Sequence, residues 1–181
     1  EVNILDRIHK HNPIYSFKYR NTDFAFVFPG FGASVSTIIL EECITLGSEK
    51  ILFFGTAGSL LTAPPCHNLF VINAAISDEG TSRHYFFKSH HCFKTDTQFT
   101  NQIESVVKNN SLDYVTGKTW TTDALYRETA ARLKKRKKQG CICVDMEASA
   151  LIAVSNYHNK AIGGFFIPHD QISARGWKIN S

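Results

Sequence analysis

The sequence of 181 residues has no apolar run near the length of about 18 residues that a membrane-spanning helix needs. Its longest apolar stretches, at residues 24–28 and 51–54, are short. Five prolines and eleven glycines are too few for a proline-rich or collagen-like chain. Charged residues make up 20% and aromatic residues 12%, a balance that excludes a disordered chain. We therefore expect one folded domain over residues 1–181 that does not contact a membrane.

Cysteine is also sparse, and its pattern excludes a disulfide framework. The five cysteines are an odd number without regular spacing. Cys141 and Cys143 are separated by one residue, so they do not form the CxxC pair of a zinc or redox site. The first seven residues lack the basic and apolar segments of a signal peptide. We expect reduced thiols, a cytoplasmic location and no bound metal.

Positive charge is concentrated in one segment. The formal net charge is +4, and residues 132–138 read RLKKRKK. One interpretation is attraction of nucleic acid or another anion. The other is the solvated face of a helix over residues 128–139, ended by Gly140. We favour the second and expect no nucleic-acid partner, because the rest of the chain is near neutral and carries no basic stripe.

Short apolar runs alternate with segments of helical periodicity. In one such segment the apolar residues Val35, Ile38, Ile39, Cys43 and Leu46 fall on one helix face. Continuous apolar strands that alternate with helices indicate an α/β domain with a parallel or mixed sheet. We predict strands at residues 24–28, 51–54, 69–75, 113–119 and 161–167, and helices at 34–46, 96–108, 128–139 and 146–155.

Small and polar residues follow the predicted strands, where α/β sheets bind their ligands. They are Gly30, Thr56, residues 78–82, residues 121–123 and Asp170, and we expect them to converge on one face.

Four motifs at these positions each have a functional and a structural interpretation. Residues 29–34 (PGFGAS) can admit an anion to a helix N-terminus or form a tight turn, but they lack the third glycine of a dinucleotide fingerprint. Residues 55–58 (GTAG) can hold a phosphate or form a plain turn. Residues 144–150 (VDMEASA) offer two carboxylates, for the helix dipole or for ligand hydroxyls. Asp170 can protonate a leaving group or cap a helix.

Six segments in order resemble the nucleoside phosphorylase family that includes uridine phosphorylase and the hexameric purine nucleoside phosphorylases. They are GFGAS, LGSEKILFFGTAGSL, DEGTSRHY, GKTWTTDALYRET, GCICVDMEASAL and the strand end at Asp170. The sequence is most similar to the uridine-phosphorylase-like branch. The resemblance implies a three-layer α/β/α fold whose mixed central sheet closes partly into a barrel. It implies phosphorolysis, in which a nucleoside and phosphate give a free base and ribose 1-phosphate, with no other cofactor.

The resemblance also assigns the site residues. Asp170 matches the acid that protonates a purine N7. Met146 and Glu147 match the ribose contacts, and Thr56 and Gly55 match the phosphate site. Residues 122–126 match the wall of the base pocket. The residues expected at the base are Val144, Thr122, Tyr126 and Gly58.

Several positions depart from the family pattern. Phe53 stands where members commonly carry a phosphate-binding Arg, Ser77 precedes the DEGTS segment in place of Arg, and His169 replaces a small residue. The family's first strand is expected before Glu1, and the helix after Asp170 is cut to 11 residues. Replacement phosphate ligands are sought among Arg20, Arg83 and Arg127, or in a neighbouring subunit.

These departures keep two alternatives open, a nucleosidase that uses water and a non-catalytic nucleoside-binding member. The choice between purine and pyrimidine also stays open, because Asp170 suits a purine and the branch resemblance suits uridine. The resemblance implies a homodimer or a trimer of dimers. Phe86, Phe87 and Phe93 are expected either at that interface or in the core.

Overall fold

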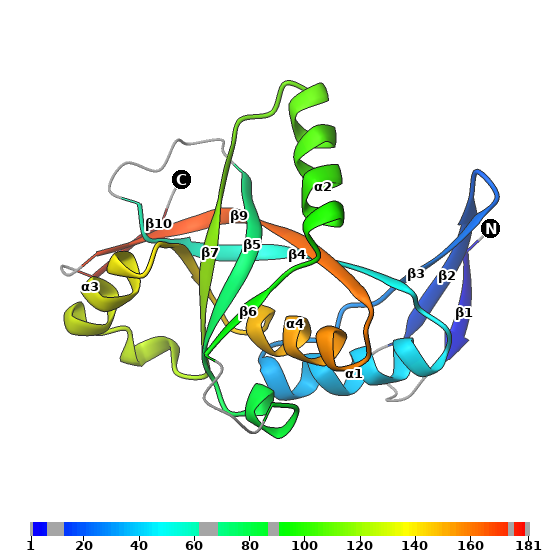
Figure 1. The fold of residues 1–181 in the computed structure, drawn as a ribbon, viewed down its shortest axis with the longest axis horizontal. Coiled ribbons are helices and arrows are strands. Elements are labelled where there is room, and N and C mark those ends of the chain that lie inside the picture. The colour runs from blue at the N-terminus through cyan, green and yellow to red at the C-terminus, as the bar shows by residue number, and fades with distance from the viewer. Residues whose placement is uncertain (1, 7–12, 62–68, 87–90, 174–175, 180–181) are drawn as a thin grey trace.

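The computed structural model describes residues 2–6, 13–61, 69–86, 91–173 and 176–179 (Figure 1). Two sheets, four α-helices and two short 3₁₀ segments make up this part of the chain. The strands are β1 (Val2–Asp6), β2 (Ile14–Tyr19), β3 (Thr22–Phe26), β4 (Lys50–Ser59), β5 (Leu69–Asp78), β6 (Cys92–Lys94), β7 (Tyr114–Thr122), β8 (Cys141–Asp145), β9 (Ala161–Ser173) and β10 (Gly176–Ile179). The helices are α1 (Ala33–Thr45), α2 (Thr97–Asn109), α3 (Ala130–Lys138) and α4 (Ala148–Tyr157), with 3₁₀ segments η1 (Thr81–His84) and η2 (Leu125–Arg127).

The larger sheet is mixed and closes on itself. Its strand order is β10-β9-β4-β8-β7-β5-β6, and β9 also pairs with β5 in antiparallel fashion. This extra pairing closes β9, β4, β8, β7 and β5 into a five-stranded barrel. The predicted α/β class, with a mixed sheet partly closed into a barrel, is confirmed.

Helices cover the barrel on two sides (Figure 1). α1 and α4 pack together below the sheet in this view, and α2 lies on the opposite side. α2 begins at Asp96, whose carboxylate accepts the Phe99 backbone N–H at 2.6 Å, and it buries Ile103 and Val107 against the sheet. α1 ends before Gly47, whose φ of 102° suits glycine at this position.

The sequence predicted a buried strand at residues 24–28. This prediction is wrong. β3 belongs to a separate sheet of order β1-β2-β3, and all five of its residues are exposed. Figure 1 shows this sheet standing beside the barrel. Its aromatic residues pack on one another, because Phe17 and Phe24 stack with ring centroids 5.3 Å apart.

Three other predicted boundaries are wrong for a common reason. Residues 55–58 form the end of β4 and not a turn, since β9 pairs with them along the strand. β9 continues through Asp170 to Ser173, paired with β10 at its end. Residues 141–145 form β8, so the last helix begins at Ala148 and not at Met146. In each case backbone pairing with a distant strand overrides the local turn or helix signal.

The core explains two residues that the sequence left open. Phe93 is 4% exposed within the largest apolar cluster, and the Phe86 ring lies 5.4 Å from it. Both residues thus pack in the core of the chain, the second of the two interpretations, and Phe87 lies outside the described residues. Phe53 is also buried, against Phe166, with ring centroids 5.6 Å apart. Among the described residues, no helix is long and apolar enough to cross a membrane.

The packing of Phe53 predicts a strict requirement for glycine at position 164. A Cβ added to Gly164 would overlap the Phe53 ring, whereas a Cβ added to Gly55 would meet nothing closer than Phe166 at 3.8 Å. We expect Gly164→Ala to lower the free energy of unfolding by about 1–3 kcal/mol through overpacking. Gly55→Ala is the matched control, with a change within about 0.5 kcal/mol. Urea denaturation measures both, and equal stability of the two variants would contradict this account.

Candidate active site

Residues at the carboxyl ends of several strands meet because the strand register aligns them. Asp170 in β9 lies opposite Gly58 in β4, and Gly58 lies opposite Val144 in β8. The same row continues through Trp120 in β7 to Ile76 in β5. The structure therefore brings Asp170, Gly58 and Val144 together at the edge of the sheet where a ligand is expected.

Glu147 joins the start of α4 to the glycine-rich loop at residues 29–32. Its Oε1 accepts a hydrogen bond from the Gly32 backbone N–H at 2.6 Å, and its Oε2 accepts one from Met146 N–H at 3.3 Å. Gly32 has a φ of 94°, which residues other than glycine rarely adopt. The prediction placed Glu147 in the first turn of the helix. It is instead the N-cap residue of α4.

The carboxylate of Asp145 fixes the backbone on which Glu147 stands. Its Oδ1 accepts hydrogen bonds from the hydroxyls of Thr119 and Thr121, at 2.7 and 2.9 Å. Its Oδ2 accepts the backbone N–H groups of Glu147 and Ala148, at 2.7 and 2.5 Å. Asp145 is thus the acid that serves the α4 N-terminus, and the Glu147 carboxylate is left to face the glycine loop.

The environment of Glu147 disfavours its charge. Burial, and then the nearby Asp145 carboxylate, raise the pKa of Glu147 to about 7, although the bonds from Gly32 and Met146 oppose the shift. Burial also raises the pKa of Asp145. Two carboxyl groups this close resist simultaneous ionisation, so Glu147 changes charge near neutral pH.

A third acid, Glu79, is enclosed by hydroxyl groups. It is 2% exposed and accepts hydrogen bonds from Ser77 Oγ at 2.8 Å, Ser82 N–H at 3.0 Å and Ser149 Oγ at 3.0 Å. Burial raises the pKa of Glu79, but the hydrogen bonds together lower it by more, so its pKa lies below the ordinary value. Glu79 thereby ties η1 to α4 beside the Asp145 network.

The residues predicted at the base lie in two different environments. Val144 and Thr122 are 4% and 1% exposed, whereas Tyr126 in η2 is 86% exposed. Gly58 faces the core, because a Cβ added there would overlap Ile172. The glycine at position 58 is therefore required by packing, whatever it contacts besides.

The residues predicted at the phosphate lie in β4. Alternation along the strand turns the Thr56 side chain to the exposed face, while Phe53 and Ala57 are buried on the other. Gly55 lies between them, opposite Phe166 of β9. Position 53 thus supplies an apolar ring to the core and no cation to this strand.

The arginines proposed as replacements lie on separate segments. Arg20 is in the turn between β2 and β3, Arg83 in η1 and Arg127 in η2, and all three are exposed. η1 approaches the start of α1, where Thr81 Oγ1 and Ser34 Oγ lie 3.1 Å apart. Arg83 is therefore the candidate on a segment that also borders the glycine loop.

Asp170 is a half-buried acid inside β9. Burial raises its pKa, and the neighbouring His169 lowers it by a smaller amount. The alternative interpretation of Asp170 as a helix cap is wrong, because Asp170 lies within β9 and pairs with Ile179 of β10.

Sequence reasoning missed the structural roles of Asp145 and Glu79. Asp145 is bonded to two distant Thr hydroxyls, and Glu79 to Ser77 and to the distant Ser149. Nothing in the sequence marks the distant partners. Sequence reasoning also missed that Arg136, in the basic run at residues 132–138, is buried against the sheet. Arg136 is 8% exposed and its Nη2 lies 2.9 Å from Asp78 Oδ2, so that face of α3 is not solvated.

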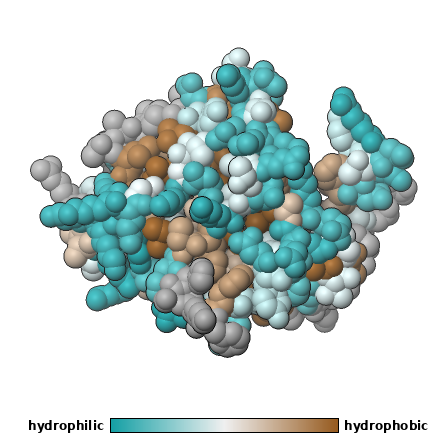
Figure 2. All heavy atoms as spheres, in the orientation of Figure 1, coloured by the Kyte–Doolittle hydropathy of each residue, from teal (hydrophilic) through white to brown (hydrophobic). Residues whose placement is uncertain are grey.

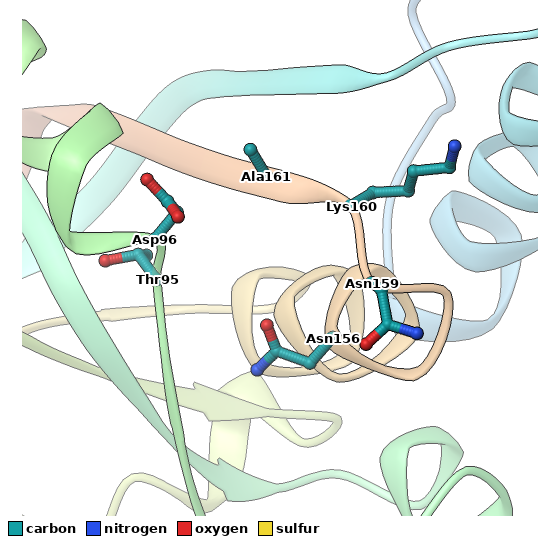
Figure 3. Close-up of a pocket in the computed structure, with 6 residues that line it drawn as sticks. All are labelled: Thr95, Asp96, Asn156, Asn159, Lys160 and Ala161. Carbon is teal, nitrogen blue, oxygen red and sulfur yellow. The ribbon is translucent and has the colours of Figure 1, made fainter.

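A polar cavity of about 460 Å³ lies elsewhere, where α4 ends and α2 begins (Figure 3). Its lining residues are Thr95, Asp96, Asn156, Asn159, Lys160 and Ala161. Ala161 begins β9, whereas Asp170 lies near its other end, so this cavity is separate from the row of site residues. Among the described residues, no three His, Cys, Asp or Glu side chains are grouped to hold a metal ion.

Comparison with known proteins identifies related sequences. The family model of the Phosphorylase superfamily matches residues 1–176. An uncharacterized protein of Acanthamoeba polyphaga mimivirus is 28% identical over 97% of this chain and 68% of its own length. A guanosine phosphorylase of Halorubrum lacusprofundi is 24% identical over 78% of this chain and 58% of its own. A DeoD-type purine nucleoside phosphorylase of Shewanella oneidensis is 23% identical over 80% of this chain and 61% of its own.

Solved structures show the same fold. A crystal structure of uridine phosphorylase from Vibrio fischeri matches with a TM-score of 0.84 at 23% identity, over 96% of this chain and 71% of that chain. The chain spans less than two thirds of the guanosine and purine phosphorylases that it matches.

The raised pKa of Glu147 predicts a pH dependence of stability. Between pH 4.5 and about 7 the folded state keeps a proton that the unfolded state has released, so the free energy of unfolding should fall as the pH rises through this range. Glu147→Gln removes this titration and should flatten the profile. Urea denaturation of both proteins across this pH range tests it, and profiles that run parallel would show that Glu147 does not titrate there.

Proposed function

Since the chain belongs to the phosphorylase superfamily, we propose that it cleaves the N-glycosidic bond of a nucleoside with phosphate, giving a free base and (deoxy)ribose 1-phosphate. The observation that carries this proposal is the placement of Glu147, a half-buried carboxylate held by Gly32 beside the Asp145 network. Its partners are then a nucleoside and inorganic phosphate, and no other cofactor is needed. Its similarity to a guanosine phosphorylase and a purine nucleoside phosphorylase supports the same chemistry.

In this proposal Glu147 and Met146 hold the sugar. A carboxylate accepts hydrogen bonds from two neighbouring hydroxyls, and charge-assisted bonds of this kind are strong. The Glu147 carboxylate accepts a hydrogen bond from the Gly32 backbone N–H. We propose that sugar hydroxyls donate to the same carboxylate when a nucleoside binds. Fixing the ring in this way favours the oxocarbenium-like transition state by orientation.

Asp170 is proposed to neutralise the leaving base. Its raised pKa increases the protonated fraction that a general acid needs. Val144, Gly58, Thr122 and Tyr126 would bound the base, of which Val144 and Gly58 share the strand row of Asp170. A protonating acid at this place favours a purine, whose N7 can accept the proton.

The phosphate side supports a second candidate function, hydrolysis of the same bond by water. Gly55 and Thr56 can offer an amide and a hydroxyl to phosphate, but Phe53 is buried and offers no cation. For phosphorolysis we propose that a cation comes from Arg83, Arg127 or a second subunit. A non-catalytic nucleoside-binding protein is the third alternative.

A homodimer or a trimer of dimers is proposed with it. An apolar patch of Phe28, Phe31, Val35 and Ile38 borders the glycine loop, with the first two rings 6.3 Å apart, edge to face. These side chains are between 42% and 84% exposed, which favours an interface beside the site. The free thiols of Cys43, Cys92, Cys141 and Cys143 support a reducing, cytoplasmic location.

The decisive assay measures base release with and without phosphate. Guanosine, inosine, adenosine and uridine are each incubated with the protein, and bases are separated by chromatography. We expect phosphate-dependent release with one sugar phosphate formed per base, and faster release from purines. Release without phosphate would replace phosphorolysis by hydrolysis. Binding without turnover of any nucleoside would support the non-catalytic alternative.

Two substitutions separate sugar binding from protonation. Glu147→Gln should weaken nucleoside binding by about 10–100-fold, because a charge-assisted hydrogen bond contributes about 1.5–3 kcal/mol. Asp170→Asn should keep the affinity and lower kcat for purine nucleosides by about 10²–10⁴-fold. Calorimetric titration and steady-state kinetics measure the two effects. An unchanged affinity in Glu147→Gln would remove the proposed ribose contact.

A further inference from the structure

The basic helix α3 is attached to the barrel by a shared acid. Arg136 Nη2 lies 2.9 Å from Asp78 Oδ2, and Arg132 Nη2 lies 3.6 Å from the same oxygen. Arg136 and Leu133 form the buried face of the helix. Lys134, Lys135, Lys137 and Lys138 are exposed, and Figure 2 shows hydrophilic side chains projecting on the side where Figure 1 places α3.

Asp78 also connects two strands of the barrel. Its Oδ2 accepts the Trp120 Nε1–H hydrogen bond at 3.1 Å, and the Arg136 guanidinium lies 5.6 Å from the Trp120 ring centroid. Burial raises the pKa of Asp78, but the hydrogen bond and the charge of Arg136 lower it by more. Its pKa therefore lies below the ordinary value, and the carboxylate is ionised. The carboxyl-terminal parts of β5 and β7 and the inner face of α3 therefore meet at one ion pair.

The segment between β7 and α3, residues 123–129, is held at both ends. At its start, Asp123 Oδ2 accepts the Gly80 backbone N–H at 3.0 Å. At its end, α3 is anchored by Arg136. The stretch between these two anchors contains η2, where Tyr126 lies.

We propose that Asp78 and Arg136 are positioning residues that set the place of residues 122–129, and thereby the base-side wall of the site. This inference rests on the proposed function, which puts Thr122 and Tyr126 at the base. Neither residue is proposed to touch the substrate, because Asp78 is already paired with Arg136 and Trp120. The basic run at residues 132–138 then contributes to specificity through the buried Arg136, not through its exposed lysines.

The test compares inward and outward charges on the same helix. Arg136→Met and Asp78→Asn break the ion pair, and Arg136→Lys keeps the charge if Arg136→Met fails to fold. Lys135→Met is the matched control, since it removes the same charge from an exposed position. Hydrogen exchange of the amides at residues 122–129 is measured for each folded variant, together with KM and kcat for nucleoside and for phosphate.

We expect faster exchange of the amides at residues 122–129 in Arg136→Met and Asp78→Asn. The amides of α2 should exchange at an unchanged rate in these variants, and Lys135→Met should exchange like the unsubstituted protein at residues 122–129. The KM for nucleoside should rise about 3–30-fold, the range for residues that act through a packed network. The KM for phosphate should change little, and Arg136→Lys should restore part of the loss.

Two results would overturn the inference. One is unchanged exchange at residues 122–129 in a folded variant without the ion pair, and the other is faster exchange with an unaltered KM for nucleoside. If the unsubstituted protein turns over no nucleoside, the proposed function fails, and the exchange data alone then decide whether the ion pair holds the segment.

Discussion

The candidate site depends on one buried carboxylate, Asp145. Its four hydrogen bonds come from two hydroxyls of β7 and two backbone amides at the start of α4, so one side chain joins strand to helix. Because Asp145 accepts the backbone N–H groups at the start of α4, the Glu147 carboxylate does not cap the helix and instead accepts a hydrogen bond from Gly32. Burial, and then the nearby Asp145 carboxylate, raise the pKa of Glu147 to about 7, so the candidate site contains an acid that titrates near neutral pH. The stability of the α4 N-terminus and the pKa of Glu147 are therefore coupled through Asp145.

Much of the fold follows from local pattern. The helices at residues 33–45 and 97–109 lie within one or two residues of their predicted bounds, since apolar periodicity and the Asp96 cap act locally. The glycine-rich stretch of β4 and the short strand β8 were not predicted as strands, because their pairing with β9 and β7 is a long-range property. The exposed β3 was misjudged because an apolar run alone does not say whether a second layer covers it.

The site could be predicted in outline, whereas its internal contacts could not. Strand-end reasoning selected Asp170, the family resemblance added Val144 and Gly58, and the three residues share one row of the sheet. The roles of Asp145, Glu79 and Asp78 depend on partners more than 20 residues away, such as Thr121, Ser149 and Arg136. A sequence pattern cannot reveal such pairs, because nothing local marks which distant hydroxyl or guanidinium reaches a given acid.

In the proposed function, the Glu147 carboxylate receives the hydroxyls of a sugar. The most direct measurement is a crystal structure of the protein with a bound nucleoside. The account predicts both ribose hydroxyl oxygens within about 2.6–3.2 Å of the Glu147 carboxylate oxygens, with the base on the side of Asp170 and Val144. A nucleoside bound elsewhere, with Glu147 still joined only to Gly32 and Met146, would contradict it.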